Sequence, residues 1–165
     1  MKPVGWVGPE TAIAQAIQGA CRIMPRPSLD SVMLGVAMCL AHRATCVKLS
    51  VGCVLTDKHG RMIGSGYNGV PRGMVHCTDC PCPGATAPAG ADLCQGVHAE
   101  QNALLNCRDP EQIETCYNTH APCLRCTKML LNTSCKRIVY HEDKLEQPAK
   151  DLWLAAGRIW EQVHA

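Results

Sequence analysis

Three residues with metal-binding side chains lie in two short motifs: His98-Ala99-Glu100 supplies a histidine, and Pro122-Cys123-Leu124-Arg125-Cys126 supplies two cysteines. A catalytic zinc ion takes three protein ligands and leaves a fourth position for water, and one imidazole with two thiolates is such a set. Because Cys123 and Cys126 are three residues apart, one helical turn would place both sulfur atoms on the same side. Pro122 suits the first turn of a helix, and a helix N-terminus favours the thiolate form that binds metal. These spacings predict a catalytic zinc site of His98, Cys123 and Cys126.

Glu100 follows His98 by two residues and is the candidate for proton transfer. Residues at this spacing can face one metal ion only near a helix end, and the apolar residues that follow predict a helix beginning near His98. Zinc lowers the pKa of a bound water to about 7, so a carboxylate beside it can take the proton. We therefore expect Glu100 to move protons in the reaction, without binding the metal.

Each motif alone has an ordinary alternative explanation. His-x-Glu occurs often by chance, and Cys-x-x-Cys is more often half of a structural zinc site or a redox pair. Both motifs in this order, with proline before the cysteines, match the pattern of zinc-dependent nucleobase deaminases. In that chemistry Glu100 would pass its proton to ring nitrogen N3 and then assist the departure of ammonia.

Composition limits the class of protein. A chain of 165 residues predicts one domain, and 47% hydrophobic with 18% charged residues excludes a disordered chain. The net charge of +2 is scattered, which argues against nucleic acid as a partner and fits a small-molecule substrate. The thirteen cysteines are an odd number with ligand-like spacing, and no signal peptide or membrane span is visible. We therefore expect a cytoplasmic protein that binds metal and has no membrane partner.

The hydrophobic pattern predicts strands that alternate with helices, and hence an α/β sandwich with a largely buried sheet. Residues 1–27 are expected to be an N-terminal extension with a helix over 9–23, ahead of one domain over 28–165. In that domain we expect helices over 28–44, from His98 onward, over 123–131 and over 151–156, and strands over 51–56, 61–67, 114–119, 137–141 and 159–163. Cys39 is expected in the core, and His59 in a solvated turn.

A Cys-rich loop over 74–96 provides further potential ligands. A loop of this length in a compact domain is functional or is held by something. We expect a structural zinc ion with four protein ligands. The first choices are Cys46, Cys77 and Cys94, and the fourth ligand is His76, Cys80 or Cys82. The alternative is a set of free loop thiols, which would oxidise easily.

From about Ser31 to His141 the sequence resembles the deoxycytidylate (dCMP) deaminase family of the cytidine deaminase superfamily. The residues that carry the resemblance, besides the two zinc motifs, are Arg43-Ala44-Thr45-Cys46, Val51-Gly52, Gly66-Tyr67-Asn68-Gly69-Val70-Pro71-Arg72-Gly73, His76-Cys77 and Arg137-Ile138-Val139-Tyr140. The Gly-Tyr-Asn-Gly motif, with Asn102 two residues after Glu100, separates this family from tRNA adenosine deaminases, which share the zinc ligands. The sequence departs from the family at Ala121 and Arg125, in the Cys-rich insertion and in the first 27 residues.

The resemblance implies a three-layer α/β/α fold with a five-stranded mixed sheet, and hydrolysis of dCMP to dUMP and ammonia for the supply of dTMP. The backbone N–H of Ala99 would bind the pyrimidine carbonyl, Asn68 would contact the sugar or base, and Lys48 the phosphate. The other substrate-binding candidates are Val51, Ala121 and Tyr140.

The resemblance also implies regulation and a second metal site. Some phage members bind a second zinc through cysteines that match Cys46 and Cys77. Regulated members are hexamers that dCTP activates and dTTP inhibits, so we expect a homo-oligomer. Its effector loop would contain Gly66, Tyr67, Gly69 and Arg72.

Other functions stay open at this point. Ala121 and Arg125 border the expected site, so the substrate could be a 5-modified cytosine nucleotide or a nucleoside. The scattered charge argues against single-stranded nucleic acid. A non-catalytic zinc module is the remaining alternative, but a purely structural site has no need of Glu100 beside an open ligand position.

Overall fold

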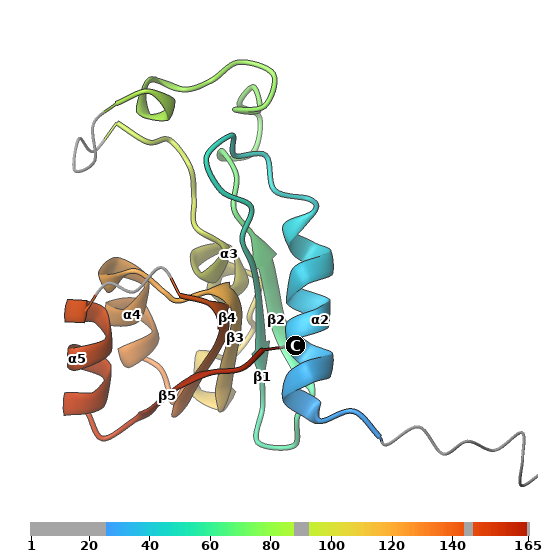
Figure 1. Ribbon diagram of the computed structural model, residues 1–165, viewed down its shortest axis with the longest axis vertical. Helices are drawn as coiled ribbons and strands as arrows, with labels where there is room; N and C mark the ends of the chain where they lie inside the picture. Colours follow the sequence, from blue (N-terminus) through green and yellow to red (C-terminus); the bar gives the residue numbers. More distant parts are fainter. Residues whose placement is uncertain (1–25, 88–92, 144–146, 165) are drawn as a thin grey trace, which may run out of the picture.

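A five-stranded mixed sheet forms the centre of the protein (Figure 1). The computed structural model describes residues 26–87, 93–143 and 147–164. The strands follow the order β2-β1-β3-β4-β5 and comprise β1 (Gly52–Thr56), β2 (Met62–Tyr67), β3 (Thr115–His120), β4 (Arg137–Glu142) and β5 (Ile159–Gln162). β1 is antiparallel to β2 and β3, whereas β4 is parallel to β3 and β5. Every residue of β1 and β3 is buried, because these central strands are covered on both faces.

Helices cover both faces of the sheet (Figure 1). In the described part of the chain, α2 (Leu29–Ala41) covers one face, and α3 (Ala99–Leu105), α4 (Leu124–Leu131) and α5 (Gln147–Ala155) cover the other. Short 3₁₀ turns at Pro83–Ala85 and Pro110–Gln112 lie in the connections. The predicted three-layer α/β/α fold with a five-stranded mixed sheet is confirmed. None of the described helices is long and apolar enough to cross a membrane.

The differences of more than one residue from the predicted bounds lie at two helix ends, and one core position also differs. The first helix ends at Ala41 rather than at residue 44, because the chain turns there and the N–H of Ala44 bonds the Ala41 carbonyl. α5 begins at Gln147 rather than at Asp151. The sequence-based prediction missed its first turn because that turn shows no apolar pattern. Cys39 is exposed, so its predicted place in the core was wrong. The helix predicted over 9–23 lies outside the described residues.

Arg158 fixes the C-terminal end of α4. Its guanidinium lies 5.0 Å from the centre of the Trp153 ring and donates to four backbone carbonyls, those of Leu130, Leu131, Thr133 and Cys135. The last carbonyls of a helix have no partner within the helix, so a cation placed there satisfies them. The same helix begins at the two cysteines predicted to bind zinc, and Arg158 therefore fixes the far end of the element that carries them.

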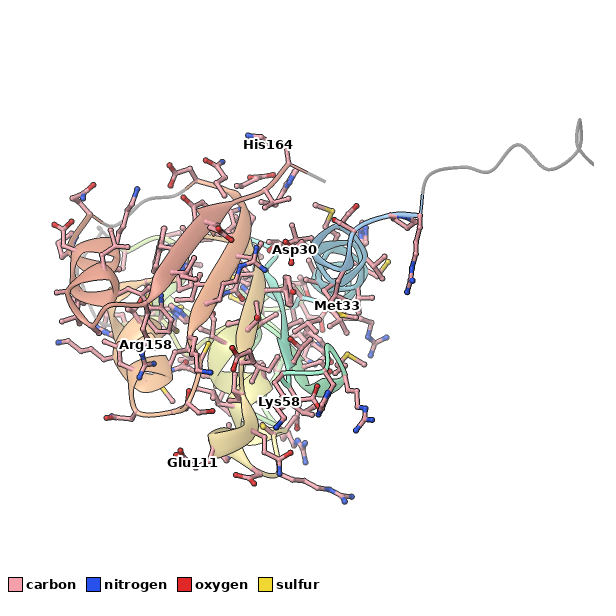
Figure 2. The ribbon with its side chains drawn as sticks, turned by 90° about the horizontal axis from the view of Figure 1, so that it is seen from below. Asp30, Met33, Lys58, Glu111, Arg158 and His164 are labelled. Atoms are coloured by element: carbon pink, nitrogen blue, oxygen red, sulfur yellow. The ribbon has the colours of Figure 1, made fainter. Side chains whose placement is uncertain are left out.

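Asp30 joins α2 to two strands, and Figure 2 shows it on the side of α2 that faces the sheet. Its carboxylate accepts hydrogen bonds of 2.7 and 2.8 Å from Arg137 on β4, and one of 2.8 Å from the hydroxyl of Tyr117 on β3. Arg137 also donates to Glu161 on β5 at 2.6 Å. The hydrogen bonds from Arg137, above all, hold the pKa of Asp30 below its ordinary value.

Replacing Asp30 with Asn should lower the free energy of unfolding at pH 7 by about 1–3 kcal/mol, because hydrogen bonds to a charged group are lost. Since the folded-state pKa of Asp30 is lowered, its contribution is complete above the unfolded value of 3.8 and is lost as the pH falls through the folded value. Urea unfolding at several pH values should therefore show wild type and variant converging in acid. Asp143→Asn, at an exposed position, is the control. A difference that is the same at every pH would contradict this account.

Candidate active site

The N-terminal end of α3 carries His98 and Glu100. His98 is the N-cap residue, and its backbone N–H donates to the side chain of Gln101 at 2.8 Å. α3 lies very close to β2: a Cβ atom at Gly66 would stand 2.5 Å from the backbone nitrogen of Ala103. The side chain of Asn102 donates to the Tyr67 carbonyl on β2 at 2.8 Å. Glycine at position 66 and the asparagine on α3 thus set where the helix begins.

The N-terminal end of α4 supplies the two cysteines. Cys123 is the N-cap residue and Cys126 lies in the first turn, so both sulfur atoms face α3. Nδ1 of His98 lies 3.5 Å from the sulfur of Cys123 and 3.5 Å from that of Cys126. Ligands bound to zinc at ~2.3 Å (sulfur) and ~2.0 Å (nitrogen), at a tetrahedral angle of about 109°, lie roughly 3.5 Å apart. Both distances from His98 therefore fit edges of a zinc tetrahedron, and all three donor atoms lie within 4.8 Å of one another.

Without metal, the two thiols are unequal. Hydrogen bonds, first from Cys126 and then from His98, lower the pKa of Cys123 to about 3. The hydrogen bond to Cys123 raises the pKa of Cys126, which is buried. The opposite directions of these two pKa shifts indicate that, without metal, Cys123 loses its proton before Cys126 does. A bound zinc ion would remove the proton of Cys126 too, because a coordinating thiol is deprotonated.

Glu100 is buried, with 4% of its surface exposed. This burial raises its pKa to about 6, against a smaller opposing effect of a hydrogen bond from its own backbone. A carboxyl group with a pKa near the working pH can both accept and release a proton. A cation bound by His98 and the cysteines would lower this pKa again and favour the carboxylate.

A cavity of about 240 Å³, termed the catalytic cavity because the predicted catalytic residues line it, opens beside these groups. It brings together seven of the residues predicted for the catalytic site: Val51, Asn68, His98, Ala99, Glu100, Ala121 and Cys123. Its walls also include residues that the sequence did not assign to catalysis: Cys46, Leu49, Cys94, Gly96, Val97 and His120. Among these further residues, His120 could have been found from the sequence, because it directly follows the strand predicted over 114–119 and precedes Pro122 by two residues.

Two predicted substrate contacts do not line this cavity. Tyr140 is 3% exposed and packs in the core against Trp160, with ring centres 5.8 Å apart. It lies within strand β4 and does not line the cavity, so the structure gives no support to its predicted substrate contact. Lys48 is exposed and stands next to Leu49, which does line the cavity.

Asn68 has a structural role within the cavity wall. Its side-chain oxygen accepts from the N–H of Val51 at 2.8 Å, and its side-chain nitrogen donates to the Leu49 carbonyl at 2.7 Å. These bonds hold residues 49–51, two of which line the cavity. The oxygen is thereby engaged, and one N–H of the side-chain amide is left for a substrate.

A second, larger cavity of about 930 Å³ contains the four predicted effector-loop residues, Gly66, Tyr67, Gly69 and Arg72. Arg43, His42 and His76 add basic side chains to its wall. Val97 lines both cavities and pairs with Gly69 through two backbone hydrogen bonds of 2.8 and 3.1 Å. The two cavities therefore share a wall one residue before His98.

The Cys-rich loop extends from the end of the sheet (Figure 1). Its Cys77 thiol accepts from the backbone N–H of Cys82 at 3.3 Å. A backbone hydrogen bond from Gln95, followed by one from the Cys77 side chain, lowers the pKa of Cys82. Cys46 and Cys94 line the catalytic cavity instead. Among the described residues, only His98, Cys123 and Cys126 bring three donor atoms within 4.8 Å of one another, so the first-choice trio of loop cysteines does not form such a group.

Comparison with known proteins gives consistent results. Residues 27–142 match the cytidine and deoxycytidylate deaminase zinc-binding region. The deoxycytidylate deaminase of Mycobacterium phage D29 is 38% identical over 128 residues, covering 73% of this chain and 99% of that protein. That of Schizosaccharomyces pombe is 36% identical over 140 residues, covering 80% of this chain and 43% of that longer protein. The dCMP deaminase of cyanophage S-TIM5, in complex with dCMP and dUMP, has a TM-score of 0.70 at 25% identity, covering 84% and 98% of the two chains.

Replacing Asn68 with Ala should lower the free energy of unfolding by about 1–3 kcal/mol, since the Val51 N–H and the Leu49 carbonyl lose their partners. Hydrogen exchange of residues 49–51 should become faster, which can be measured by mass spectrometry. Asn132→Ala, at the exposed end of α4, is the matched control. Unchanged exchange in the Asn68 variant would mean that this side chain does not hold the segment in solution.

Proposed function

The chain belongs to the cytidine and deoxycytidylate deaminase family, and we propose that it hydrolyses dCMP to dUMP and ammonia with a catalytic zinc ion. The observation that carries this proposal is the donor set of His98, Cys123 and Cys126, with Nδ1 of His98 3.5 Å from each sulfur, beside the buried carboxyl of Glu100. The D29 relative and the S-TIM5 enzyme, both named for this reaction, support dCMP as the substrate.

When bound, zinc supplies a Lewis acid that lowers the pKa of a water ligand to about 7. Glu100 then accepts the water proton, delivers it to N3 of the pyrimidine and afterwards assists the leaving ammonia. The backbone N–H of Ala99, in the first turn of α3, binds the pyrimidine carbonyl. The buried position of Glu100 keeps the carboxyl out of bulk water, so that it exchanges protons with the substrate.

The phosphate contact remains a prediction. Lys48 is the candidate from the sequence, and its neighbour Leu49 lines the cavity. Arg125, in the first turn of α4, and Arg72 are two further candidate cations for this role. A 5-modified cytosine nucleotide is the alternative substrate.

We also propose that dCTP and dTTP bind in the second cavity of a homo-oligomer, such as a hexamer. The basic side chains there suit a triphosphate, because arginine binds phosphate in a bidentate manner. The shared wall at Val97 supports a route from that cavity to His98.

A structural zinc ion in the Cys-rich loop is a further part of the proposal. The contact between Cys77 and Cys82, and the backbone hydrogen bonds that favour the thiolate of Cys82, support these two as ligands. This choice favours Cys82 over His76 and Cys80 in the predicted set. The twelve described cysteines are all unpaired, which supports a reducing, cytoplasmic location.

Glu100→Gln should reduce kcat on dCMP by about 10²–10⁴-fold while zinc content and fold are retained, because positioned proton transfer is lost. Ammonia release from dCMP, 5-methyl-dCMP, CMP, dCTP and deoxycytidine by the wild-type protein identifies the substrate. Glu111→Gln, at an exposed turn, is the matched control. Near-normal turnover in the Glu100 variant would remove this residue from the mechanism, and equal activity on deoxycytidine and dCMP would contradict phosphate recognition.

Metal analysis should find two zinc ions per chain. Cys126→Ser should remove one, and Cys77→Ser or Cys82→Ser the other. Loss of the loop zinc should lower the melting temperature before it weakens substrate binding, because a structural zinc contributes to folding. Cys39→Ser, at an exposed position on α2, should retain both ions. A single zinc ion in protein prepared without chelators would exclude the loop site.

A further inference from the structure

His120 ends β3, and its imidazole lies in the wall of the catalytic cavity. Only 11% of the side chain is exposed. Nδ1 lies 3.0 Å from the hydroxyl of Thr119, and Nε2 lies 3.0 Å from the carboxylate of Glu142 on β4. The Thr119 hydroxyl also accepts from the backbone N–H of Gly52 on β1, at 3.2 Å. Contacts from β3 and β4 therefore fix the orientation of the ring, and the hydrogen bond from β1 fixes the hydroxyl of Thr119.

The partners of His120 also assign its protons. A carboxylate only accepts hydrogen bonds, so Nε2 carries a proton and donates it to Glu142. In the neutral ring Nδ1 is then an acceptor, and the hydroxyl of Thr119 donates to it. Since both nitrogens contact protein groups, the ring is suited to shaping the cavity rather than to exchanging protons with a substrate.

The position of this ring relative to Glu100 decides what it can contact. C4 of the pyrimidine must lie at the donor set of His98 and the cysteines, and N3 must face Glu100 at the start of α3. N3 and C5 lie on opposite sides of C4 in the ring. The C5 edge consequently faces away from Glu100, and the connection from β3 to α4 brings His120 and Ala121 into the wall of the same cavity.

We propose that His120 is a specificity-determining residue, and that its fixed ring, beside the small Ala121, sets the size of the C5 substituent that the cavity accepts. The inference rests on the proposed function, because it uses Glu100 to orient the pyrimidine. It adds His120 to the residues proposed to act on the substrate. The hydrogen bonds to Thr119 and Glu142 hold its ring rigidly in the cavity wall, so that the wall selects among cytosine nucleotides by their shape.

The test is the ratio of kcat/KM for 5-methyl-dCMP to kcat/KM for dCMP, measured in one preparation by chromatography of the products dTMP and dUMP. His120→Ala should raise this ratio at least ten-fold, since one methyl group in a fitted pocket changes selection by roughly 10–200-fold. His120→Phe refills the space and should return the ratio to within about three-fold of wild type. Glu142→Ala, which frees one side of the ring, should raise it by less than His120→Ala does.

A residue that only supports the fold would lower both activities together and leave the ratio unchanged. His59→Ala, in an exposed turn, is the control for replacement of a histidine. A ratio that stays within about two-fold of wild type in the His120→Ala and Glu142→Ala variants would overturn the proposal, because a fitted wall gives a larger effect.

Failure of the proposed function would be visible separately. In that case the wild-type protein deaminates neither nucleotide. Calorimetric titration then measures the affinities for dUMP and dTMP, which differ by the C5 methyl group. The ratio of these affinities tests the same part of the cavity without turnover. If His120→Ala raises the affinity for dTMP relative to that for dUMP, the proposed role of His120 is supported. An unchanged ratio of the two affinities overturns it.

Discussion

The close packing of α3 on β2 places the groups on which the site depends. No side chain fits at Gly66, where a Cβ atom would also stand 2.5 Å from the carbonyl oxygen of Ala99. Two asparagine side chains donate to carbonyls of β2: Asn102 of α3 bonds Tyr67, and Asn106, the C-cap residue of α3, bonds Ser65. Because the helix is held at this distance along its length, its first turn has a fixed position. His98 and Glu100 take their places from that packing.

The second half of the site depends on α4, which is held at both ends. Its C-terminal carbonyls are satisfied by Arg158, and its N-terminal end follows the buried strand β3. The N-termini of the two helices therefore meet at one end of the strands, where their partial positive charges favour thiolates and a carboxylate. Burial opposes the charge on Glu100 and raises its pKa to about 6. A bound cation would compensate for this burial, so that metal binding and the charge of Glu100 are linked.

Several polar side chains around the cavity form hydrogen bonds that hold the protein backbone, in addition to any contact with a substrate. Asn68 holds residues 49–51, and Thr119 joins Gly52 to His120. Buried polar groups need hydrogen-bond partners, so each of these contacts also fixes a wall of the cavity. Structural and functional roles thus coincide at the same residues, and a substitution at Asn68 would alter both.

The sequence alone predicted most of the fold and brought together the three donor residues that the structure places side by side. The spacing of His98, Glu100, Cys123 and Cys126 predicted the donor set and the proton-transfer residue, because metal coordination restricts both residue types and helical spacing. The hydrophobic pattern and the turn residues predicted the positions of all five strands, because strand residues and the turns that bound them can be recognised over short stretches of sequence. α5 was placed too late, because the first turn of a helix that begins with Gln147 and Pro148 has no apolar pattern.

Only the tertiary structure decided which residues share a cavity. Tyr140 belongs to a motif of the resemblance, yet the register of β4 places it in the core beside Trp160. His120 and Val97 have no motif of their own, and they reach the cavity because β3 ends there and because Val97 pairs with Gly69. The Cys-rich loop shows the same limit, as Cys46 and Cys94 lie at the catalytic cavity while Cys77 and Cys82 contact each other. Such placements depend on contacts between residues distant in sequence, and local spacing carries no information about them.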